Sequence, residues 1–337
     1  MPPRTVLHLG PDVREPGGMA NVIRAYLRAD LAPWRVEAVA TYAASSRPRW
    51  LARLVASAAR VATAPRSRTA GLHLHASERF DLTRTLALLE LAQRRGLPRI
   101  VTLHGAEFMH EVRTRPRLVR RMLSRADVVT VLSAEVEKAV RALGVEHVRL
   151  LPNAVDVPAA AAPLSGSDVL FAGEVGRRKG VDVLLEAWPS VRGDRPEATL
   201  RLVGPIAEPE LLAALPEGCR YDGVLTSDEV TDALGSSCLA VLPSRAEAMP
   251  MFILEAMAAG VPVVATPVGS VEWLLSTGGR VVPAGDAAAL AAALAELLGD
   301  RAQLRALGAA ARRRVEDELS SAVFERNVKA LYAEVFG

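Results

Sequence analysis

The chain has 337 residues, and at about 150 residues per domain this length predicts two domains. Half of the residues are hydrophobic and 23% are charged, a composition that excludes a disordered chain. The two cysteines, Cys219 and Cys238, exclude a disulfide scaffold and a multi-cysteine metal cluster. Neither a membrane-spanning apolar run nor a signal peptide is recognisable, so we expect a cytoplasmic protein.

The net charge of +3 conceals an asymmetry between the two halves of the chain. Residues 1–160 contain 25 Lys and Arg against 14 Asp and Glu, a net charge of +11, whereas residues 161–337 carry −8. The basic half predicts an anionic partner, such as nucleic acid, a membrane surface or a phosphorylated substrate. Lysine is rare among the basic residues, which singles out Lys179.

The N-terminal half alternates short apolar runs with helical patterns. The runs predict strands at 5–9, 36–40, 71–75, 99–103, 127–132 and 147–151, and the patterns predict helices at 19–31, 82–95 and 134–143. Continuous apolar strands that alternate with helices favour a parallel sheet covered on both faces.

Residues 152–166 are rich in proline, alanine and other small residues and predict an interdomain linker, after which the alternation restarts. Strands are predicted at 168–172, 199–203, 219–221, 239–242, 262–265 and 280–282, and helices at 180–188, 228–234, 252–259, 287–298, 303–316 and 321–336. The predicted fold class is therefore α/β, with two Rossmann-like doubly wound domains at 1–157 and 163–319. Such domains would face a ligand cleft, because ligands collect at the carboxyl ends of parallel strands.

The first candidate ligand loop is the Pro-Gly-Gly-Met sequence at 16–19, which contains Gly17 and Gly18 and precedes a predicted helix. Glycine lets the backbone approach a ligand closely, and the free N–H groups of a helix N-terminus favour an anion such as a diphosphate. The alternative is an ordinary strand-to-helix turn.

The second candidate is the His-Gly-Ala-Glu sequence that directly follows the strand at 99–103. His104 could donate a hydrogen bond to a sugar hydroxyl or a phosphate, and the alternative is a histidine satisfied by backbone groups. That alternative is favoured for the other strand histidines, His8, His73 and His75. No histidine pair has a convincing zinc-ligand spacing with an acidic or cysteine third ligand.

The third candidate loop, residues 173–180, lies between a predicted strand and a helix and contains Arg177, Arg178 and Lys179. Three basic side chains at a helix N-terminus suit a pyrophosphate in charge, donor count and dipole. Gly180 stands where a Walker A loop has serine or threonine, so this is not such a loop. The alternative is a solvated basic turn.

The fourth candidate is the segment 243–260, in which Glu247 lies in a loop and Glu255 near the start of a helix. Two fixed carboxylates bind the paired hydroxyls of a ribose or hexose well, because ionised carboxylates only accept hydrogen bonds. The segment Met249, Pro250 and Met251 could add anion contacts through the backbone N–H groups of its two methionines. The alternative is a pair of solvated glutamates, but Glu255 lies in an apolar run, where a charge without a partner is costly.

Taken together, these motifs resemble the retaining GT-B glycosyltransferases of family 4. The resemblance is carried by Glu247-x7-Glu255 followed by Ala-Met-Ala-Ala-Gly-Val-Pro-Val-Val, by the glycine pair, by His104, by Arg178-Lys179-Gly180 and by Asn153-Ala-Val-Asp156. The motifs follow the family's order along nearly the whole chain. The resemblance implies two Rossmann-like domains with a nucleotide-sugar in the cleft and a C-terminal helix, 320–337, packed back on the N-terminal domain.

The resemblance also implies roles for individual residues. Glu255 would hold the ribose hydroxyls and Glu247 the transferred sugar, while Lys179 and Arg178 would bind the diphosphate. Gly17 and Gly18 would lend backbone N–H groups to the diphosphate. His104 would contact the donor sugar near the reacting carbon.

Three positions depart from the family's pattern. Glu174 stands where the family often has arginine, so that Arg177 or Arg178 is expected to compensate. Ala154 replaces the usual glycine at the linker, and Ala-Met-Pro follows Glu247 in place of Gly-Phe-Gly. The last variant is similar to the branch that builds surface polysaccharides.

The resemblance implies an EC 2.4 enzyme that moves a sugar from a UDP- or GDP-sugar to a lipid-linked or glycan acceptor, with retention and without a nucleic acid partner. No Asp-x-Asp follows a strand, so we expect no obligatory metal and no cofactor besides the nucleotide-sugar co-substrate. Two other classes share the architecture: nucleotide-sugar 2-epimerases, and non-catalytic nucleotide-sugar binding proteins. The Glu-x7-Glu segment favours the transferase.

A basic amphipathic helix is predicted within residues 47–68. Its apolar stripe would comprise Trp50, Leu51, Leu54, Val55, Ala58 and Val61, and its basic stripe Arg49, Arg53 and Arg60. Such a helix suits an anionic lipid surface, and we expect a peripheral contact with the inner membrane leaflet. The alternative is that the stripe packs on the N-terminal sheet while the arginines are solvated.

Overall fold

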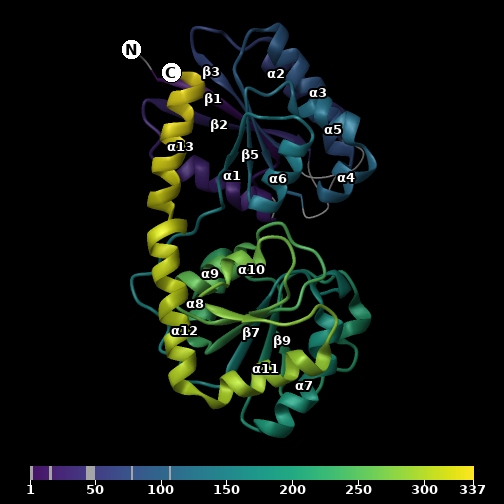
Figure 1. The fold of residues 1–337 in the computed structure, drawn as a ribbon, viewed down its shortest axis with the longest axis vertical. Helices are drawn as coiled ribbons and strands as arrows, with labels where there is room; N and C mark the ends of the chain where they lie inside the picture. The colour runs from purple at the N-terminus through teal and green to yellow at the C-terminus, as the bar shows by residue number, and fades with distance from the viewer. Residues whose placement is uncertain (1–2, 15–16, 43–49, 77–78, 106–107) are drawn as a thin grey trace. The chain divides into compact units, whose positions relative to one another are not determined.

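The computed structural model describes residues 3–14, 17–42, 50–76, 79–105 and 108–337, and it separates into two compact units (Figure 1). Unit 1 comprises Met1–Ala154 and Ser321–Gly337, and unit 2 comprises Val155–Ser320. The connection between the two sheets, residues 151–167, contains no helix or strand apart from one bridge between Val155 and Ser320.

Unit 1 contains a six-stranded parallel sheet in the order β2-β1-β3-β4-β5-β6. The strands are β1 (Arg4–Pro11), β2 (Trp34–Tyr42), β3 (Thr69–Ala76), β4 (Arg99–Leu103), β5 (Val128–Val131) and β6 (Val148–Leu150). The order reverses between β1 and β3, and ligands of doubly wound sheets bind at such a switch point.

The helices of unit 1 are α1 (Gly18–Arg28), α2 (Trp50–Ala62), α3 (Arg79–Arg94), α4 (Phe108–Thr114), α5 (Pro116–Leu123), α6 (Ala134–Ala142) and α13 (Ser321–Phe336). Because side chains alternate along a strand, each strand gives one set of residues to each face of the sheet. On one face the set is apolar, and it forms a single hydrophobic cluster with α2, α3 and α5. Leu7, Leu74 and Val129 are strand members of this cluster.

The opposite face of the same sheet is polar at its centre. It carries His8, His73, His75, Thr102 and Thr130, and all five are buried. Tyr26 of α1 and Tyr332 of α13 lie against these side chains. The C-terminal helix therefore completes a buried polar layer in unit 1.

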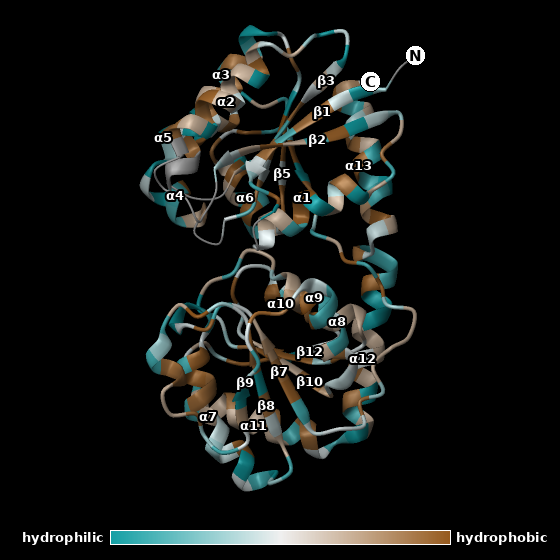
Figure 2. Ribbon diagram, turned by 180° about the vertical axis from the view of Figure 1, so that it is seen from behind, coloured by the Kyte–Doolittle hydropathy of each residue, from teal (hydrophilic) through white to brown (hydrophobic). Residues whose placement is uncertain are grey.

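Unit 2 also contains a six-stranded parallel sheet, in the order β12-β11-β10-β7-β8-β9 (Figure 2). Its strands are β7 (Asp168–Ala172), β8 (Thr199–Val203), β9 (Cys219–Tyr221), β10 (Leu239–Leu242), β11 (Val263–Ala265) and β12 (Gly279–Val281). In chain order this is the arrangement 6-5-4-1-2-3, which is that of the Rossmann fold. Its switch point lies between β7 and β10.

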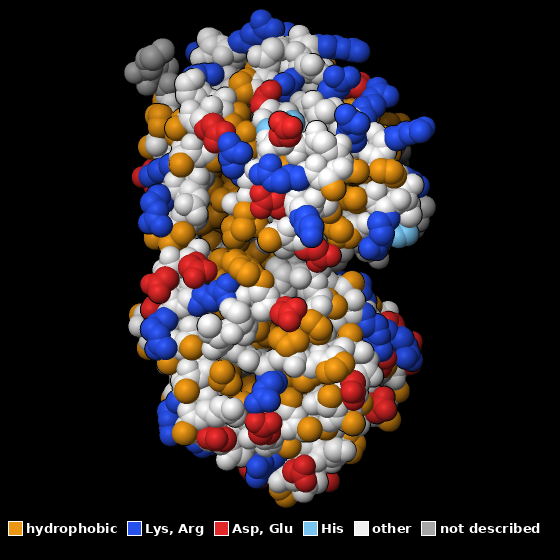
Figure 3. All heavy atoms as spheres, in the orientation of Figure 1, with side chains coloured by type: hydrophobic (Ala, Val, Ile, Leu, Met, Phe, Trp, Pro, Cys, Tyr) orange, Lys and Arg blue, Asp and Glu red, His pale blue; other side chains and the backbone are white. Residues whose placement is uncertain are grey.

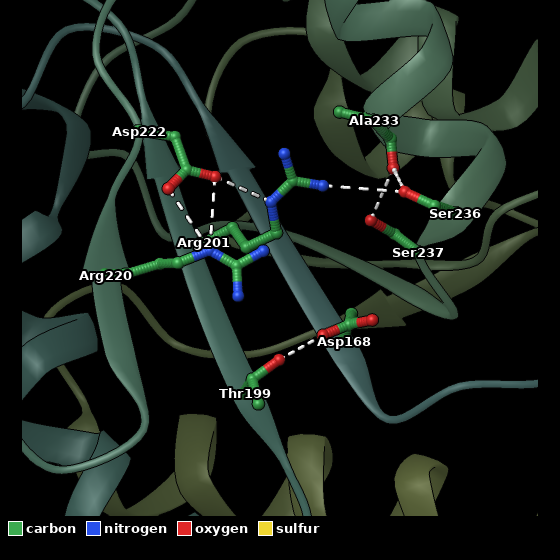
Figure 4. Close-up of polar contacts among 8 residues, drawn as sticks. All are labelled: Asp168, Thr199, Arg201, Arg220, Asp222, Ala233, Ser236 and Ser237. Carbon is green, nitrogen blue, oxygen red and sulfur yellow. Dashed lines mark hydrogen bonds and ion pairs between the residues drawn. The ribbon is translucent and has the colours of Figure 1, made fainter.

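The helices of unit 2 are α7 (Val181–Asp194), α8 (Ser227–Ser236), α9 (Met251–Ala258), α10 (Val271–Leu274), α11 (Ala287–Gly299) and α12 (Arg301–Arg314). Polar contacts tie the outer strands together (Figure 4). Arg201 of β8 pairs with Asp222 at 2.8 Å, and Asp222 also pairs with Arg220 at 3.2 Å. Thr199 donates a hydrogen bond to Asp168 across β7 and β8.

The structure confirms the predicted fold class, because each of the twelve predicted strands is present and both sheets are parallel. Three helices were not predicted: α4 and α5, which follow the His104 loop, and the single-turn α10. The helix predicted at 180–188 is longer in the structure, where α7 continues through Pro189 to Asp194. Burial of Trp188 and Val191 supports this helix although proline removes one of its backbone hydrogen bonds.

Helix α2 packs on the sheet through one of its sides. Val61 is fully buried, and Leu54 and Ala58 contact the hydrophobic cluster, whereas Leu51 and Val55 are 56% and 60% exposed. Residues 47–49, and the side chain of Trp50, lie outside the described part of the chain. No helix among the described residues is long and apolar enough to cross a membrane.

Two arginines of the basic stripe, which the alternative interpretation leaves solvated, are paired with carboxylates. Arg53 pairs with Asp12 at 2.9 Å, and Arg60 pairs with Glu37 at 2.7 Å. On the face drawn in Figure 3, Lys and Arg side chains gather over α2, α3 and α5 of unit 1, whereas basic and acidic side chains mix on unit 2.

Candidate functional site

Two loops of unit 2 begin at the switch point of its sheet. The loop after β7 spans residues 173–180, and the loop after β10 spans residues 243–250. Because β7 and β10 are hydrogen-bonded neighbours and run parallel, their carboxyl ends lie side by side. The third and fourth loops of the sequence analysis therefore meet at the edge where such sheets bind ligands.

An ion pair joins these two loops. The Nζ atom of Lys179 lies 2.5 Å from Oε1 of Glu247, and their side chains are only 15% and 7% exposed. The hydroxyl of Ser244 donates a hydrogen bond to the same oxygen at 2.6 Å, and the hydroxyl of Thr266 donates to the carbonyl oxygen of Ser244. Glu247 is thus fixed in position by a cation and a hydroxyl.

Gly180 allows the two loops to approach closely. Its φ of 73° lies in the left-handed region, and a Cβ atom there would be 1.9 Å from the carbonyl oxygen of Pro243. The backbone N–H of Arg245 also donates to the carbonyl oxygen of Arg178 at 2.9 Å. Only glycine fits at this contact, which brings Lys179 within reach of Glu247.

The basic turn before α7 is held mainly by acidic side chains. Arg245 makes two hydrogen bonds to Asp182, at 2.7 and 2.8 Å, and donates another to the carbonyl oxygen of Arg177. Arg177 itself contacts Asp182 at 3.4 Å and Glu208 at 3.2 Å. Its charge is therefore shared between two carboxylates.

Arg178 is held less firmly than its neighbours. It is 48% exposed, and its guanidinium forms an ion pair at 3.3 Å with Glu174, which is itself 39% exposed. An exposed pair of this kind contributes little and exchanges partners readily. Of the two arginines that could compensate for Glu174, Arg178 is the more available to an anion. The carboxylate of Glu174 beside it reduces the net positive charge that Arg178 offers.

Glu255 is the fifth residue of α9 and lies among buried apolar side chains. Its carboxylate has no hydrogen-bond partner within the described residues, and burial raises its pKa to about 7. Met249 and Pro250 are buried, and α9 begins at Met251 without a side-chain cap. The first turn of α9 therefore presents backbone N–H groups and a partial positive charge.

In unit 1, Gly17 and Gly18 lie at the start of α1, again without a side-chain cap. Gly17 has a φ of 152°, and a Cβ atom at either glycine would meet no described atom within 4 Å. The space beside this turn is open for a ligand. Pro16, the first residue of the predicted loop, lies outside the described residues.

His104 follows β4, and its backbone N–H donates to the carbonyl oxygen of Ala76 at 2.8 Å. Its Nε2 atom lies 2.9 Å from Nδ1 of His75, and burial lowers the pKa of His104 to about 3. The imidazole is therefore neutral at pH 7. Ala106 and Glu107 of the same loop lie outside the part of the chain that the structure describes.

The other strand histidines are satisfied by side chains and not by backbone groups, which corrects the expectation for them. His8 contacts His75 at 2.9 Å and Tyr332 at 2.6 Å, and His73 contacts Thr102 at 2.6 Å and Tyr332 at 3.2 Å. Burial holds the pKa of each of the three imidazoles well below its usual value.

These three histidines are also the group, within the described residues, whose nitrogen atoms are close enough to hold a metal ion. The ligand atoms of His8, His73 and His75 lie within 4.8 Å of one another. Each ring nitrogen already has a hydrogen-bond partner, so the cluster is satisfied as it stands.

Three polar residues that follow strands at or beside the two switch points were not found from the sequence. Ser244 and Thr266 each follow a strand of unit 2, and their place at a strand end is the signal that was overlooked. Asp12 follows β1 in unit 1, where the Arg14 guanidinium, together with Arg53, holds the pKa of its carboxyl well below the usual range.

Family profiles match both units. The profile described as Glycosyltransferase Family 4 matches residues 16–158, and the profile described as Glycosyl transferases group 1 matches residues 166–300. Between them the two matches include every residue to which the sequence analysis assigned a role in binding or catalysis.

The chain is similar to curated proteins over about half of their length. It is 36% identical over 192 residues to a phosphatidyl-myo-inositol mannosyltransferase of Mycobacterium leprae, covering 52% of this chain and 51% of that protein. It is 34% identical over 170 residues to a GDP-mannose-dependent monoacylated alpha-(1-6)-phosphatidylinositol monomannoside mannosyltransferase of Corynebacterium glutamicum, covering 47% and 45%.

Solved structures share the fold along nearly the whole chain. The sucrose-phosphate synthase of Thermosynechococcus elongatus has a TM-score of 0.83 at 20% identity, covering 98% of each chain. The HepE protein of Anabaena, crystallised with UDP and glucose, has a TM-score of 0.75 at 15% identity, covering 98% of this chain and 99% of its own. At these identities the likeness concerns the fold alone.

Proposed function

Because the chain belongs to the family 4 glycosyltransferases, we propose that it transfers a sugar from a nucleoside diphosphate donor to an acceptor, with retention of the anomeric configuration. The observation that carries the proposal is the Lys179–Glu247 pair at the switch point of unit 2, with the unpaired carboxylate of Glu255 on the following helix. A cation beside two acceptor groups suits a ligand that combines phosphates with vicinal hydroxyls.

In this proposal unit 2 binds the donor. Lys179 and Arg178 bind the diphosphate, and the Nζ of Lys179 has three donors, so it can contact a phosphate while it keeps Glu247. Glu255 accepts hydrogen bonds from the ribose hydroxyls, and Glu247 from hydroxyls of the transferred sugar. The backbone N–H groups at Met249 and Met251 add contacts to the diphosphate or the sugar.

Charge develops on the leaving diphosphate as its bond to the anomeric carbon breaks. Lys179 and Arg178 would stabilise this charge, and a group already fixed in the free protein needs no rearrangement to do so. Lys179 meets that condition, because Glu247 and the close contact at Gly180 fix its position. We assign no protein nucleophile, and we propose that the acceptor oxygen attacks on the same face that the diphosphate leaves.

Unit 1 is proposed to serve the acceptor and the reacting sugar. His104 would contact the donor sugar near the anomeric carbon, and Gly17 and Gly18 would offer backbone N–H groups to the diphosphate. The open space beside both glycines and the uncapped start of α1 support the second assignment. The neutral imidazole of His104 supports a role in hydrogen bonding rather than in charge stabilisation.

The proposed acceptor is a lipid-linked intermediate or a growing surface polysaccharide, and the donor is a UDP- or GDP-sugar. Two relatives are named as mannosyltransferases of phosphatidylinositol lipids, one of them dependent on GDP-mannose, and HepE was crystallised with UDP. A lipid-linked acceptor would bring the enzyme to the inner membrane leaflet. The exposed Leu51 and Val55 of α2 and the net charge of +11 in residues 1–160 support such a contact.

The membrane contact is tested by co-sedimentation with liposomes. We expect binding to anionic vesicles at low salt and loss of that binding at high salt, because each basic residue near an anionic surface contributes ~1 kcal/mol that salt weakens. The Leu51→Ser and Val55→Ser double variant should reduce binding without unfolding, since both side chains are exposed. Equal binding to neutral and anionic vesicles, or no binding, would contradict the contact.

Donor binding and turnover are tested in two steps. A thermal-shift screen of UDP- and GDP-sugars identifies the donor, because a ligand that binds the folded state raises the melting temperature. The labelled donor is then incubated with the protein alone and with a lipid extract. Glycosylated lipid with retained configuration supports the proposal, epimerised donor without acceptor would identify a 2-epimerase, and binding without any product would identify a binding protein.

A further inference from the structure

The polar face of the unit 1 sheet contains one continuous run of hydrogen bonds. The run passes from His104 to His75 at 2.9 Å, to His8 at 2.9 Å, to Tyr332 at 2.6 Å, to His73 at 3.2 Å, to Thr102 at 2.6 Å and to Thr130 at 2.5 Å. The hydroxyl of Tyr332 is the only link between His8 and His73 in this run.

Every ring nitrogen of the four histidines takes part in the run except Nδ1 of His104, which has no partner among the described residues. A neutral imidazole carries one N–H and one bare nitrogen, so it donates on one side and accepts on the other. Tyr332 has one hydroxyl proton, so it likewise accepts from one histidine and donates to the other. Burial keeps all four rings and the phenol neutral.

Only two arrangements satisfy all of these bonds. If His104 donates from Nε2 to Nδ1 of His75, then His75 must donate from Nε2 to His8, His8 from Nε2 to Tyr332, Tyr332 to Nδ1 of His73, and His73 from Nε2 to Thr102. In the reverse arrangement all four rings carry their proton on Nδ1. The four histidines therefore share one tautomer, whichever direction the run takes.

The Nε2–H form is the intrinsically favoured tautomer of a neutral histidine side chain in water. In this run of hydrogen bonds the small preference applies to all four rings together, because no ring can change its tautomer alone without leaving a buried polar group unpaired. The hydroxyls of Thr102 and Thr130 rotate and accept either direction, so they do not oppose the preference.

We propose that Tyr332 is a positioning residue: its hydroxyl joins the four histidines into one wire with Nε2–H rings, so that His104 presents Nδ1 as a fixed hydrogen-bond acceptor. The corresponding ligand group is a hydroxyl of the transferred sugar, which donates to that nitrogen. This ligand assignment depends on the proposed function, whereas the wire itself does not. A residue near the C-terminus thereby determines the chemistry of a loop more than 200 positions before it in the sequence.

The wire is tested by NMR on the ligand-free protein labelled with ¹⁵N at its histidines. Two-bond correlations distinguish a protonated ring nitrogen from a bare one in each of His8, His73, His75 and His104. We expect Nε2–H for all four at pH 7. Mixed tautomers would overturn the wire, and four Nδ1–H rings would overturn its direction. Stoichiometric zinc in the purified protein would also overturn it, because a metal-bound nitrogen cannot serve as a link.

The Tyr332→Phe variant removes the link and keeps the buried ring. In this variant an Nε2–H on His8 would be a buried donor without an acceptor, which is less tolerable than a bare nitrogen. We therefore expect His8, His75 and His104 to change to Nδ1–H, while His73 stays Nε2–H because it still donates to Thr102. Four unchanged rings would overturn the assignment of Tyr332.

Tyr26→Phe is the matched control. Tyr26 is equally buried and its ring packs at an angle against the same histidines, but its hydroxyl contacts Thr102, so the run from His104 to His73 stays intact. We expect the wild-type tautomers in this variant. With a donor identified, Tyr332→Phe should lower kcat roughly tenfold, as for one lost hydrogen bond, and Tyr26→Phe should not. If no nucleotide-sugar binds, the proposed function fails, but the tautomers measured by NMR on the ligand-free protein still test whether the wire exists.

Discussion

The two sheets of this protein have the same parallel architecture but different electrostatics in the polar groups that lie beside their switch points. In unit 1 burial keeps the imidazoles of β1 and β3 neutral, and the ionised carboxylate that follows β1, Asp12, is paired with Arg14 and Arg53. In unit 2 the side chains beside β7 and β10 are a lysine and two glutamates, and the lysine is paired with one of them. The fold therefore provides the location of a site but not its charge.

The difference follows from the partners that each buried group has. The histidines of unit 1 have other histidines as neighbours, so a proton on one ring would be repelled by a proton on the next. Lys179 and Glu247 have each other and the hydroxyl of Ser244, which offsets the cost of removing two charges from water. In the proposed function unit 2 would therefore bind a charged ligand, and unit 1 would contribute directional hydrogen bonds.

The largest expected effect comes from removing the charge at unit 2. We expect Lys179→Ala to reduce kcat for sugar transfer by roughly 10²–10³-fold, because the charge that develops on the diphosphate loses its stabilising cation. The same change leaves Glu247 nearly buried without its cation and should destabilise the fold by up to about 3 kcal/mol. Turnover and the free energy of unfolding are measured on the same preparation.

The double variant Lys179→Ala with Glu247→Gln isolates the effect on stability. It removes the unpaired charge, so stability should recover, while activity should stay low because both substitutions remove proposed contacts to the donor. Recovery of activity together with stability would show that Lys179 acts only on the fold and would remove the contrast between the two units.

A second comparison uses the two glycines that have positive φ angles in the candidate loops. Gly180→Ala should destabilise by more than about 3 kcal/mol, because the new Cβ would lie 1.9 Å from the carbonyl oxygen of Pro243 in addition to the strain at φ 73°. Gly17→Ala in unit 1 should cost only about 1–2 kcal/mol, since no described atom lies within 4 Å of its Cβ. Urea unfolding of both variants measures the difference, and equal losses would contradict it.

The strands and the class of the fold could be predicted because most of the strands are short apolar runs followed by glycine, proline or a polar residue. The loops that meet in unit 2 could be predicted for the same reason, since they follow strands. Their pairing could not, because Lys179 and Glu247 are 68 residues apart and the sequence does not show which carboxylate a lysine contacts.

The buried polar layer of unit 1 was the main feature that the sequence did not reveal. The runs that contain His8, His73 and His75 alternate apolar and imidazole side chains, and this alternation indicates two different faces of one sheet. The partner that completes the layer, Tyr332, lies 324 positions from His8 and reaches it only through the packing of α13. No local pattern encodes such a contact.

The next expected effect is a pH dependence specific to unit 2. Burial raises the pKa of Glu255 from 4.5 to about 7, so the folded protein holds a proton there that the unfolded chain releases. The fold is therefore favoured at low pH, and this contribution is lost as pH rises from about 4.5 through 7, by at most about 3 kcal/mol. Glu255→Gln should gain stability relative to the wild type between pH 5 and pH 8.

The same variant should bind the nucleotide about tenfold more weakly at pH 8, where the wild-type carboxylate is ionised and accepts hydrogen bonds from the ribose. Titration of UDP or GDP at pH 6 and pH 8 measures this, with the wild type gaining affinity at the higher pH and the variant staying level. Equal pH dependence in both proteins would assign the titration to another group. The comparison with the neutral imidazoles of unit 1 would then no longer rest on a titrating carboxylate at Glu255.

The smallest expected effect is that of a chelator. In the proposed function Lys179 and Arg178 of unit 2 stabilise the leaving group, and in unit 1 the ring nitrogens of His8, His73 and His75 are each engaged in a hydrogen bond. Neither switch point therefore leaves a set of ligand atoms waiting for a metal among the described residues. We expect EDTA to change the rate of sugar transfer by less than a factor of about two, which is below 0.5 kcal/mol in the barrier.

The measurement compares turnover before and after chelation and after addition of Mg²⁺, Mn²⁺ or Zn²⁺. A complete loss that Mg²⁺ or Mn²⁺ restores would place a cation at the diphosphate and assign part of the charge stabilisation to it, whereas restoration by Zn²⁺ alone would direct attention to the histidines of unit 1.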